Sequence, residues 1–145
     1  MKILVINGPN LNRLGDRNKI QYGRLTLKEI ESLLTAEFPE TAFTFYQSNS
    51  EGDIIDQIQN APRVFDGIII NPGGYAHTSV AIRDALEDCS IHKIEVHLSH
   101  IVTREDYRQN LITASACDGY ISGFKENSYL AGIFLLNKII AEIGK

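Results

Sequence analysis

The chain has 145 residues, the length of one ordinary domain, and a formal net charge of −4. Its apolar fraction of 43% and charged fraction of 22% exclude disordered and collagen-like proteins. The acidic charge argues against nucleic-acid binding, and two cysteines, Cys89 and Cys117, are too few for a disulfide scaffold.

The first apolar run covers only residues 3–6, and a secretory signal needs about 7–15 apolar residues. No run approaches the roughly 20 apolar residues of a membrane span. We therefore expect one soluble cytoplasmic domain over residues 1–145, with no membrane and no nucleic-acid partner.

Strand-like and helix-like segments alternate along the chain. Short apolar or β-branched runs predict strands at residues 2–6, 42–47, 67–70, 93–98 and, more weakly, 119–122. Apolar residues at helical spacing predict helices from Leu27, around Ile54–Ile58, over residues 82–89 and from Leu130 to near Gly144. Thr26 and Glu29 have the spacing of a capping box, and a shorter helix is expected over residues 104–111.

This alternation predicts an α/β fold, a flavodoxin-like doubly wound parallel sheet of five strands with helices on both faces. In such folds ligands bind beyond the carboxyl ends of the strands. Polar groups collect there in this sequence: Asn7-Gly8-Pro9-Asn10 follows the first strand, Asn71-Pro72-Gly73-Gly74 the third, and Ser99-His100 the fourth. The alternative is ordinary turn chemistry, which uses the same residue types.

Residues 11–24 form a long connection, where 2–6 residues are usual, and long connections are often lids over active sites. The segment carries Arg13, Arg17, Lys19 and Arg24 against one acid, Asp16, which favours an anionic ligand. It also carries Tyr22, whose phenolate form a nearby guanidinium would favour. The alternative is a solvated loop with unrelated charges.

Glu95 and His97 are two residues apart on the fourth strand, so both side chains point to one face. A carboxylate beside a histidine fixes its tautomer and suits it to acid–base catalysis. The alternative is a buried pair that serves only the core.

Asp84 falls on the opposite side of its helix from Ile82, Ala85, Leu86 and Cys89, so it points away from the sheet. It is either a solvent-exposed acid or a residue presented to another subunit. Cys89 continues the apolar stripe, and its spacing from His92 is not matched by a second ligand pair, so we expect no metal.

Five segments in this order resemble type II 3-dehydroquinate dehydratases over essentially the whole chain. They are INGPNLNRLGDR at residues 6–17, YG at 22–23, NPGGYAHTSVAIRDAL at 71–86, IEVHLS at 94–99 and the RxxYR pattern at 104–108. The resemblance implies dehydration of 3-dehydroquinate to 3-dehydroshikimate through an enolate, in the shikimate pathway, without cofactor, metal or imine.

The resemblance also implies roles for single residues. Tyr22 would be the base, Arg17 would keep it ionised, and His97 would be the acid, oriented by Glu95. Asn10 would stabilise the enolate. The substrate would be bound by Asn71, His77 and Arg108, and its carboxylate by Leu98 and Ser99. A dodecamer of trimers is implied, in which Asp84 reaches a neighbouring subunit's site.

Two positions depart from the family pattern: Lys19 stands where a proline is usual, and residues 123–129 read GFKENSY instead of a glycine-rich stretch. Three rival functions are considered. A flavodoxin would need a Ser/Thr-rich phosphate loop after the first strand, and a phosphoreceiver domain would need acids where Asn7 and Asn71 stand. A catalytically silent ligand-binding protein would keep the fold, and only an assay excludes it.

Overall fold

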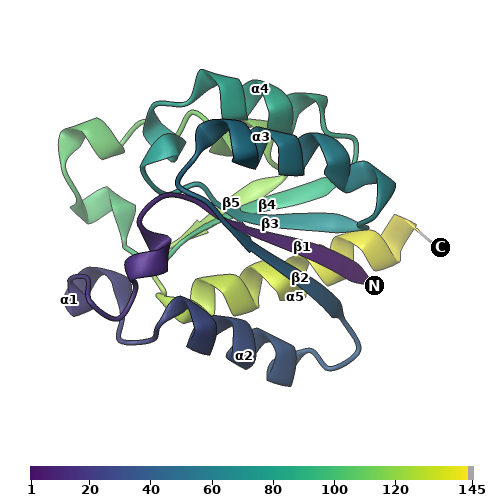
Figure 1. The fold of residues 1–145 in the computed structure, drawn as a ribbon, viewed down its shortest axis with the longest axis horizontal. Helices are drawn as coiled ribbons and strands as arrows, with labels where there is room; N and C mark the ends of the chain where they lie inside the picture. The colour runs from purple at the N-terminus through teal and green to yellow at the C-terminus, as the bar shows by residue number, and fades with distance from the viewer. Residues whose placement is uncertain (144–145) are drawn as a thin grey trace.

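The protein is described over residues 1–143 by a computed structural model, in which helices cover both faces of a central sheet (Figure 1). Within this range, five parallel strands form one sheet in the order β2-β1-β3-β4-β5. The strands are β1 (Lys2–Asn7), β2 (Ala42–Gln47), β3 (Gly67–Asn71), β4 (His92–His97) and β5 (Gly119–Ser122). This is the flavodoxin-like strand order, so the predicted fold class is confirmed.

Helices of the two layers are α2 (Leu27–Glu37) and α5 (Glu126–Ile143) on one face, and α3 (Glu51–Asn60) and α4 (Val80–Asp88) on the other (Figure 1). The central strands supply both cores because successive side chains alternate between faces. In β1, Ile3 and Val5 pack under α2 and α5, while Leu4 and Ile6 pack under α3 and α4. This two-sided burial is why the run is apolar without interruption.

The predicted capping box is confirmed, and two predictions on the helices are corrected. The capping box at Thr26 and Glu29 is formed, and Ser50 caps α3. However, α5 begins at Glu126, four residues before the predicted start, and its predicted end near Gly144 lies outside the described residues. Residues 104–111 contain only a 3-10 turn, Asp106–Arg108, and the predicted helix there is wrong.

The strand order changes direction between β1 and β3, whose last residues Asn7 and Asn71 are paired in register. After them the two chains almost touch: a Cβ on Gly8 would lie 2.4 Å from the Pro72 carbonyl oxygen. Only glycine permits that approach. It brings both polar segments to one edge of the sheet, where ligands bind in this fold. Within residues 1–143, no helix is long and apolar enough to cross a membrane.

Candidate active site

A pocket opens at the carboxyl ends of β1, β3 and β4, and nine of the eleven predicted site residues line it. They are Asn10, Arg17, Tyr22, Asn71, His77, His97, Leu98, Ser99 and Arg108. Glu95 lies behind His97, and Asp84 lies elsewhere, on α4. The lining also includes Arg104, which sequence reasoning did not select as a site residue.

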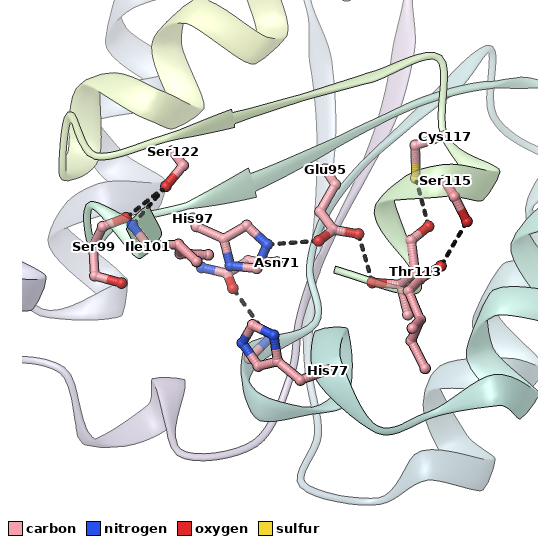
Figure 2. Close-up of polar contacts among 12 residues, drawn as sticks. Asn71, His77, Glu95, His97, Ser99, Ile101, Thr113, Ser115, Cys117 and Ser122 are labelled. Atoms are coloured by element: carbon pink, nitrogen blue, oxygen red, sulfur yellow. Dashed lines mark hydrogen bonds and ion pairs between the residues drawn. The ribbon is translucent and has the colours of Figure 1, made fainter. Parts of the chain in front are cut away.

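His97 is held from behind by a buried carboxylate. Its Nε2 lies 2.6 Å from Oε1 of Glu95, whose side chain is wholly buried, so the predicted shared face is confirmed (Figure 2). Because a carboxylate oxygen only accepts, Nε2 carries the hydrogen and Nδ1 is left for other partners. The second carboxylate oxygen of Glu95 accepts a 2.6 Å hydrogen bond from the hydroxyl of Thr113.

Tyr22 stands between two guanidinium groups. Cζ of Arg17 lies 3.9 Å from the centre of its ring, and Nη2 of Arg104 donates a 3.0 Å hydrogen bond to its hydroxyl oxygen. Nη1 of Arg104 also donates to Oγ of Ser99, which anchors the guanidinium to the rigid end of β4. The phenol oxygen thus accepts a charge-assisted hydrogen bond from one arginine, while a second arginine covers the ring.

Residues 11–24 contain short regular elements that place Tyr22 at the pocket. A 3-10 turn at Leu11–Arg13 and a one-turn helix, α1 (Lys19–Tyr22), divide the segment. The side chain of Asn18 caps α1 by accepting hydrogen bonds from the backbone N–H groups of Ile20 and Gln21. The pocket thus receives its tyrosine from a short, capped helix.

His77 faces His97 across a ring-centre distance of 6.5 Å. Burial is the main cause that lowers the pKa of His77, and the nearby His97 and Arg108 lower it further. Its Nδ1 lies 3.1 Å from the Asn110 carbonyl oxygen, which only accepts. The neutral ring therefore donates through Nδ1 and keeps Nε2 as an acceptor.

Asn71 is fixed by a buried polar chain that sequence reasoning missed. Its Nδ2 donates to the Tyr129 hydroxyl at 2.9 Å, and that hydroxyl donates to Oδ1 of Asn7 at 2.5 Å. Burial raises the pKa of Tyr129, so it stays a neutral donor. No local sequence signal links Tyr129 in α5 to the ends of β1 and β3, which are far away along the chain.

The pocket is positively charged. Arg17, Arg104 and Arg108 line it, and neither a carboxylate nor a lysine is among its lining residues in the described chain. Such a lining favours an anionic, oxygen-rich ligand, because guanidinium groups bind carboxylates through charge-assisted hydrogen bonds.

A sequence profile of the family Dehydroquinase class II matches residues 1–137. The chain belongs to this family. Among curated relatives of this chain, a 3-dehydroquinate dehydratase from Carboxydothermus hydrogenoformans is 51% identical over 138 residues. That match covers 94% of this chain and 90% of the relative.

Solved structures lead to the same family. The type II dehydroquinase of Butyrivibrio crossotus superposes with a TM-score of 0.92 at 47% identity, covering 94% of this chain and 97% of that one. The enzyme of Propionibacterium acnes gives a TM-score of 0.87 at 34% identity, covering 94% and 96%. The resemblance inferred from the motifs is therefore confirmed.

Asp84 does not line this pocket. Its side chain is 65% exposed, and its nearest charged partner is the neighbouring Arg83, at 3.7 Å. The predicted outward direction is confirmed. Cys89 is buried in the core beneath α4, as predicted, and both cysteines are free thiols. Residues 1–143 contain no group of three His, Cys, Asp or Glu side chains placed to hold a metal ion.

Proposed function

We propose that this protein catalyses the type II dehydration of 3-dehydroquinate to 3-dehydroshikimate and water, in the shikimate pathway of aromatic amino acid biosynthesis. The observation that carries the proposal is one pocket that holds both a guanidinium-bound tyrosine, Tyr22, and a carboxylate-supported histidine, His97. The elimination needs a base for a proton and an acid for a hydroxide, and this pocket offers one of each.

Tyr22 is the proposed base. The proton next to the substrate ketone is weakly acidic, so its removal needs a strong base such as a phenolate. Arg104 and Arg17 favour that charged form, since one donates to the phenol oxygen and the other lies over the ring. Removal of the proton gives an enolate, which Asn10, at the rim of the pocket, is placed to stabilise.

His97 is the proposed acid. Hydroxide is a poor leaving group, so a proton must reach its oxygen as the carbon–oxygen bond breaks. The Nε2 atom of His97 is occupied by Glu95, which leaves Nδ1 to deliver the proton. The buried carboxylate of Glu95 stabilises the imidazolium before transfer and fixes the plane of the ring.

The remaining lining groups are proposed to bind the substrate. Arg108 and the acceptor Nε2 of neutral His77 suit its hydroxyl groups, and the fixed amide of Asn71 suits another. The Leu98–Ser99 segment at the end of β4 is proposed to hold the carboxylate through backbone and hydroxyl donors. The reaction requires no cofactor and no metal, and the lining offers no lysine for an imine.

A homo-oligomer, a dodecamer of trimers, is part of the proposal, with Asp84 completing the site of a neighbouring subunit. Its support is the outward, mostly exposed Asp84 carboxylate and the large apolar side chains that stay exposed on one subunit, such as Val102, Tyr120 and Phe124. A cytoplasmic location is also proposed, because two free thiols suit a reducing compartment.

Purified protein and 3-dehydroquinate test the activity directly. We expect the ultraviolet absorbance of the conjugated enone product to rise with enzyme concentration. A chelator should not change this rate, and borohydride added with substrate should not inactivate the enzyme, because no imine forms. Folded, oligomeric protein that gives no absorbance rise would instead favour a silent ligand-binding protein.

A further inference from the structure

We infer that Thr113 is a positioning residue for the acid His97 and acts through Glu95. The inference rests on the proposed function for its kinetic consequence. Its structural part, a hydrogen-bonded chain from Thr113 to Glu95 to His97, concerns the free protein. Figure 2 shows the three side chains in line, with Glu95 in the middle.

The chain occupies both oxygens of one buried carboxylate. Oε1 of Glu95 lies 2.6 Å from Nε2 of His97, and Oε2 accepts from Oγ1 of Thr113 at 2.6 Å. Glu95 and Thr113 are both 0% exposed, so water does not replace either partner. A hydroxyl hydrogen bond to Oε2 prevents rotation of the carboxylate plane. That plane sets where the ring of His97 points.

The backbone of Thr113 is itself held at the site. Its N–H donates to the carbonyl of Ala76, next to His77, and its carbonyl accepts from the N–H of Ala116. The Cys117 thiol lies 3.8 Å from the same carbonyl. The hydroxyl is thus presented to Glu95 by a fixed turn that also contacts the other histidine of the pocket.

Thr113 does not perform the capping role that threonine usually has at the start of a helical turn. Thr113 is the N-cap of the 3-10 turn Ala114–Ala116, yet its side chain makes no capping hydrogen bond within the described chain. The hydroxyl is directed to the carboxylate instead. A threonine kept for the turn alone would bond to the backbone ahead of it, so the geometry points to a role in the site.

The groups that face this chain come from several elements. The ring centre of His77 lies 6.5 Å from that of His97, Arg108 lines the same pocket, and the Cys117 thiol lies 3.8 Å from the Thr113 carbonyl oxygen. Substitutions at Thr113 leave all three unchanged. A difference between Thr113 variants therefore reports on the hydroxyl and not on a change in the surrounding charges.

The decisive variants are Thr113→Val, which keeps the shape and removes the hydroxyl, and Thr113→Ser, which keeps the hydroxyl. We expect Thr113→Val to lower kcat by about tenfold or more, part of the roughly 10²–10⁴ that a general acid contributes, with KM nearly unchanged. Thr113→Ser should restore most of kcat. Ser115→Ala is the matched control, because the Ser115 hydroxyl lies on the same turn but donates to Ile112.

A second readout uses the ligand-free protein. In proton NMR, the Nε2–H of His97 should give a downfield, slowly exchanging signal, assigned by its loss in His97→Gln. We expect that signal to broaden or vanish in Thr113→Val and to return in Thr113→Ser. This readout needs no turnover, so it separates the positioning role from a failure of the proposed function.

Two results would overturn the inference. In the first, Thr113→Val keeps both the wild-type kcat and the His97 signal. In the second, Thr113→Val and Thr113→Ser lose kcat and thermal stability equally, which would show that Thr113 serves packing and that its hydroxyl is irrelevant.

Discussion

At the scale of single residues, Tyr22 depends on Arg104 more than the sequence indicates. Arg17 lies five residues before Tyr22, but Arg104 is 82 residues away and still makes the hydrogen bond to the hydroxyl. Composition could not reveal that pairing, because the contact exists only once folding brings α1 and the segment after β4 together. Sequence motifs did mark Arg104 as part of the RxxYR pattern, without giving it a role.

Replacing Arg104 by Gln should therefore impair turnover. A hydrogen bond to a charged group is worth about 1.5–3 kcal/mol, so we expect kcat to fall by about 10–100-fold. Steady-state kinetics with 3-dehydroquinate measure the loss. Arg13→Gln, an exposed change in the segment that carries Tyr22, should leave kcat unchanged, and an equal loss in both variants would contradict the assigned role of Arg104.

His77 gives a prediction on pH dependence. Its pKa is lowered in the folded state, mainly by burial, so the unfolded chain binds its proton more readily below the ordinary value of 6.5. The free energy of unfolding should consequently fall as pH drops from 6.5 through the lowered folded pKa. In the His77→Asn variant, the free energy of unfolding should fall less over that pH window. Urea denaturation at several pH values measures the difference. Identical pH dependence in the two proteins would contradict the lowered pKa of His77.

At the scale of elements, sequence rules predicted helix starts correctly where neighbouring residues determine them. They failed where contacts between distant segments determine the local structure. The Thr26–Glu29 spacing predicted the capping box because both partners lie within one turn. By contrast, Arg104 is extended (φ −90°, ψ −176°) and separates two 3-10 turns, so its side chain reaches the pocket and no continuous helix forms. The one-turn α1 is too short for any apolar period to predict it.

The capping box is itself testable. Thr26 accepts from the Glu29 N–H at 3.1 Å, and Glu29 accepts from the Thr26 N–H at 2.8 Å. Thr26→Ala should lower the free energy of unfolding by about 1 kcal/mol, measured by urea denaturation, because the start of α2 loses its cap. Thr26→Ser should stay close to wild type. A neutral Thr26→Ala would show that α2 is held by packing alone.

At the scale of the whole molecule, the alternation of strands and helices predicted the layers, and the topological switch point predicted where the pocket would lie. The core could be foreseen because burial on both faces of a strand imposes an unbroken apolar run. The polar chain from Asn7 through Tyr129 to Asn71 could not, since its members come from three elements.

Mixing subunits tests whether Asp84 completes a neighbour's site. We expect Tyr22→Phe and Asp84→Asn proteins each to be weakly active alone. After the two are unfolded and refolded together, about a quarter of the sites should combine an intact Tyr22 with an intact neighbouring Asp84. Activity should then exceed that of either variant refolded alone. No gain from a mixed oligomer of confirmed composition would place Asp84 outside the neighbouring site.

The most direct measurement of the central claim is the turnover number of Tyr22→Phe at saturating 3-dehydroquinate. The substitution keeps the ring over which Arg17 lies and removes only the oxygen that Arg104 contacts. We predict a loss in kcat of about 10²–10⁴-fold, with KM changed far less, because the base is removed and the pocket is kept. Turnover within a few-fold of wild type would contradict Tyr22 as the base and, with it, the proposed mechanism.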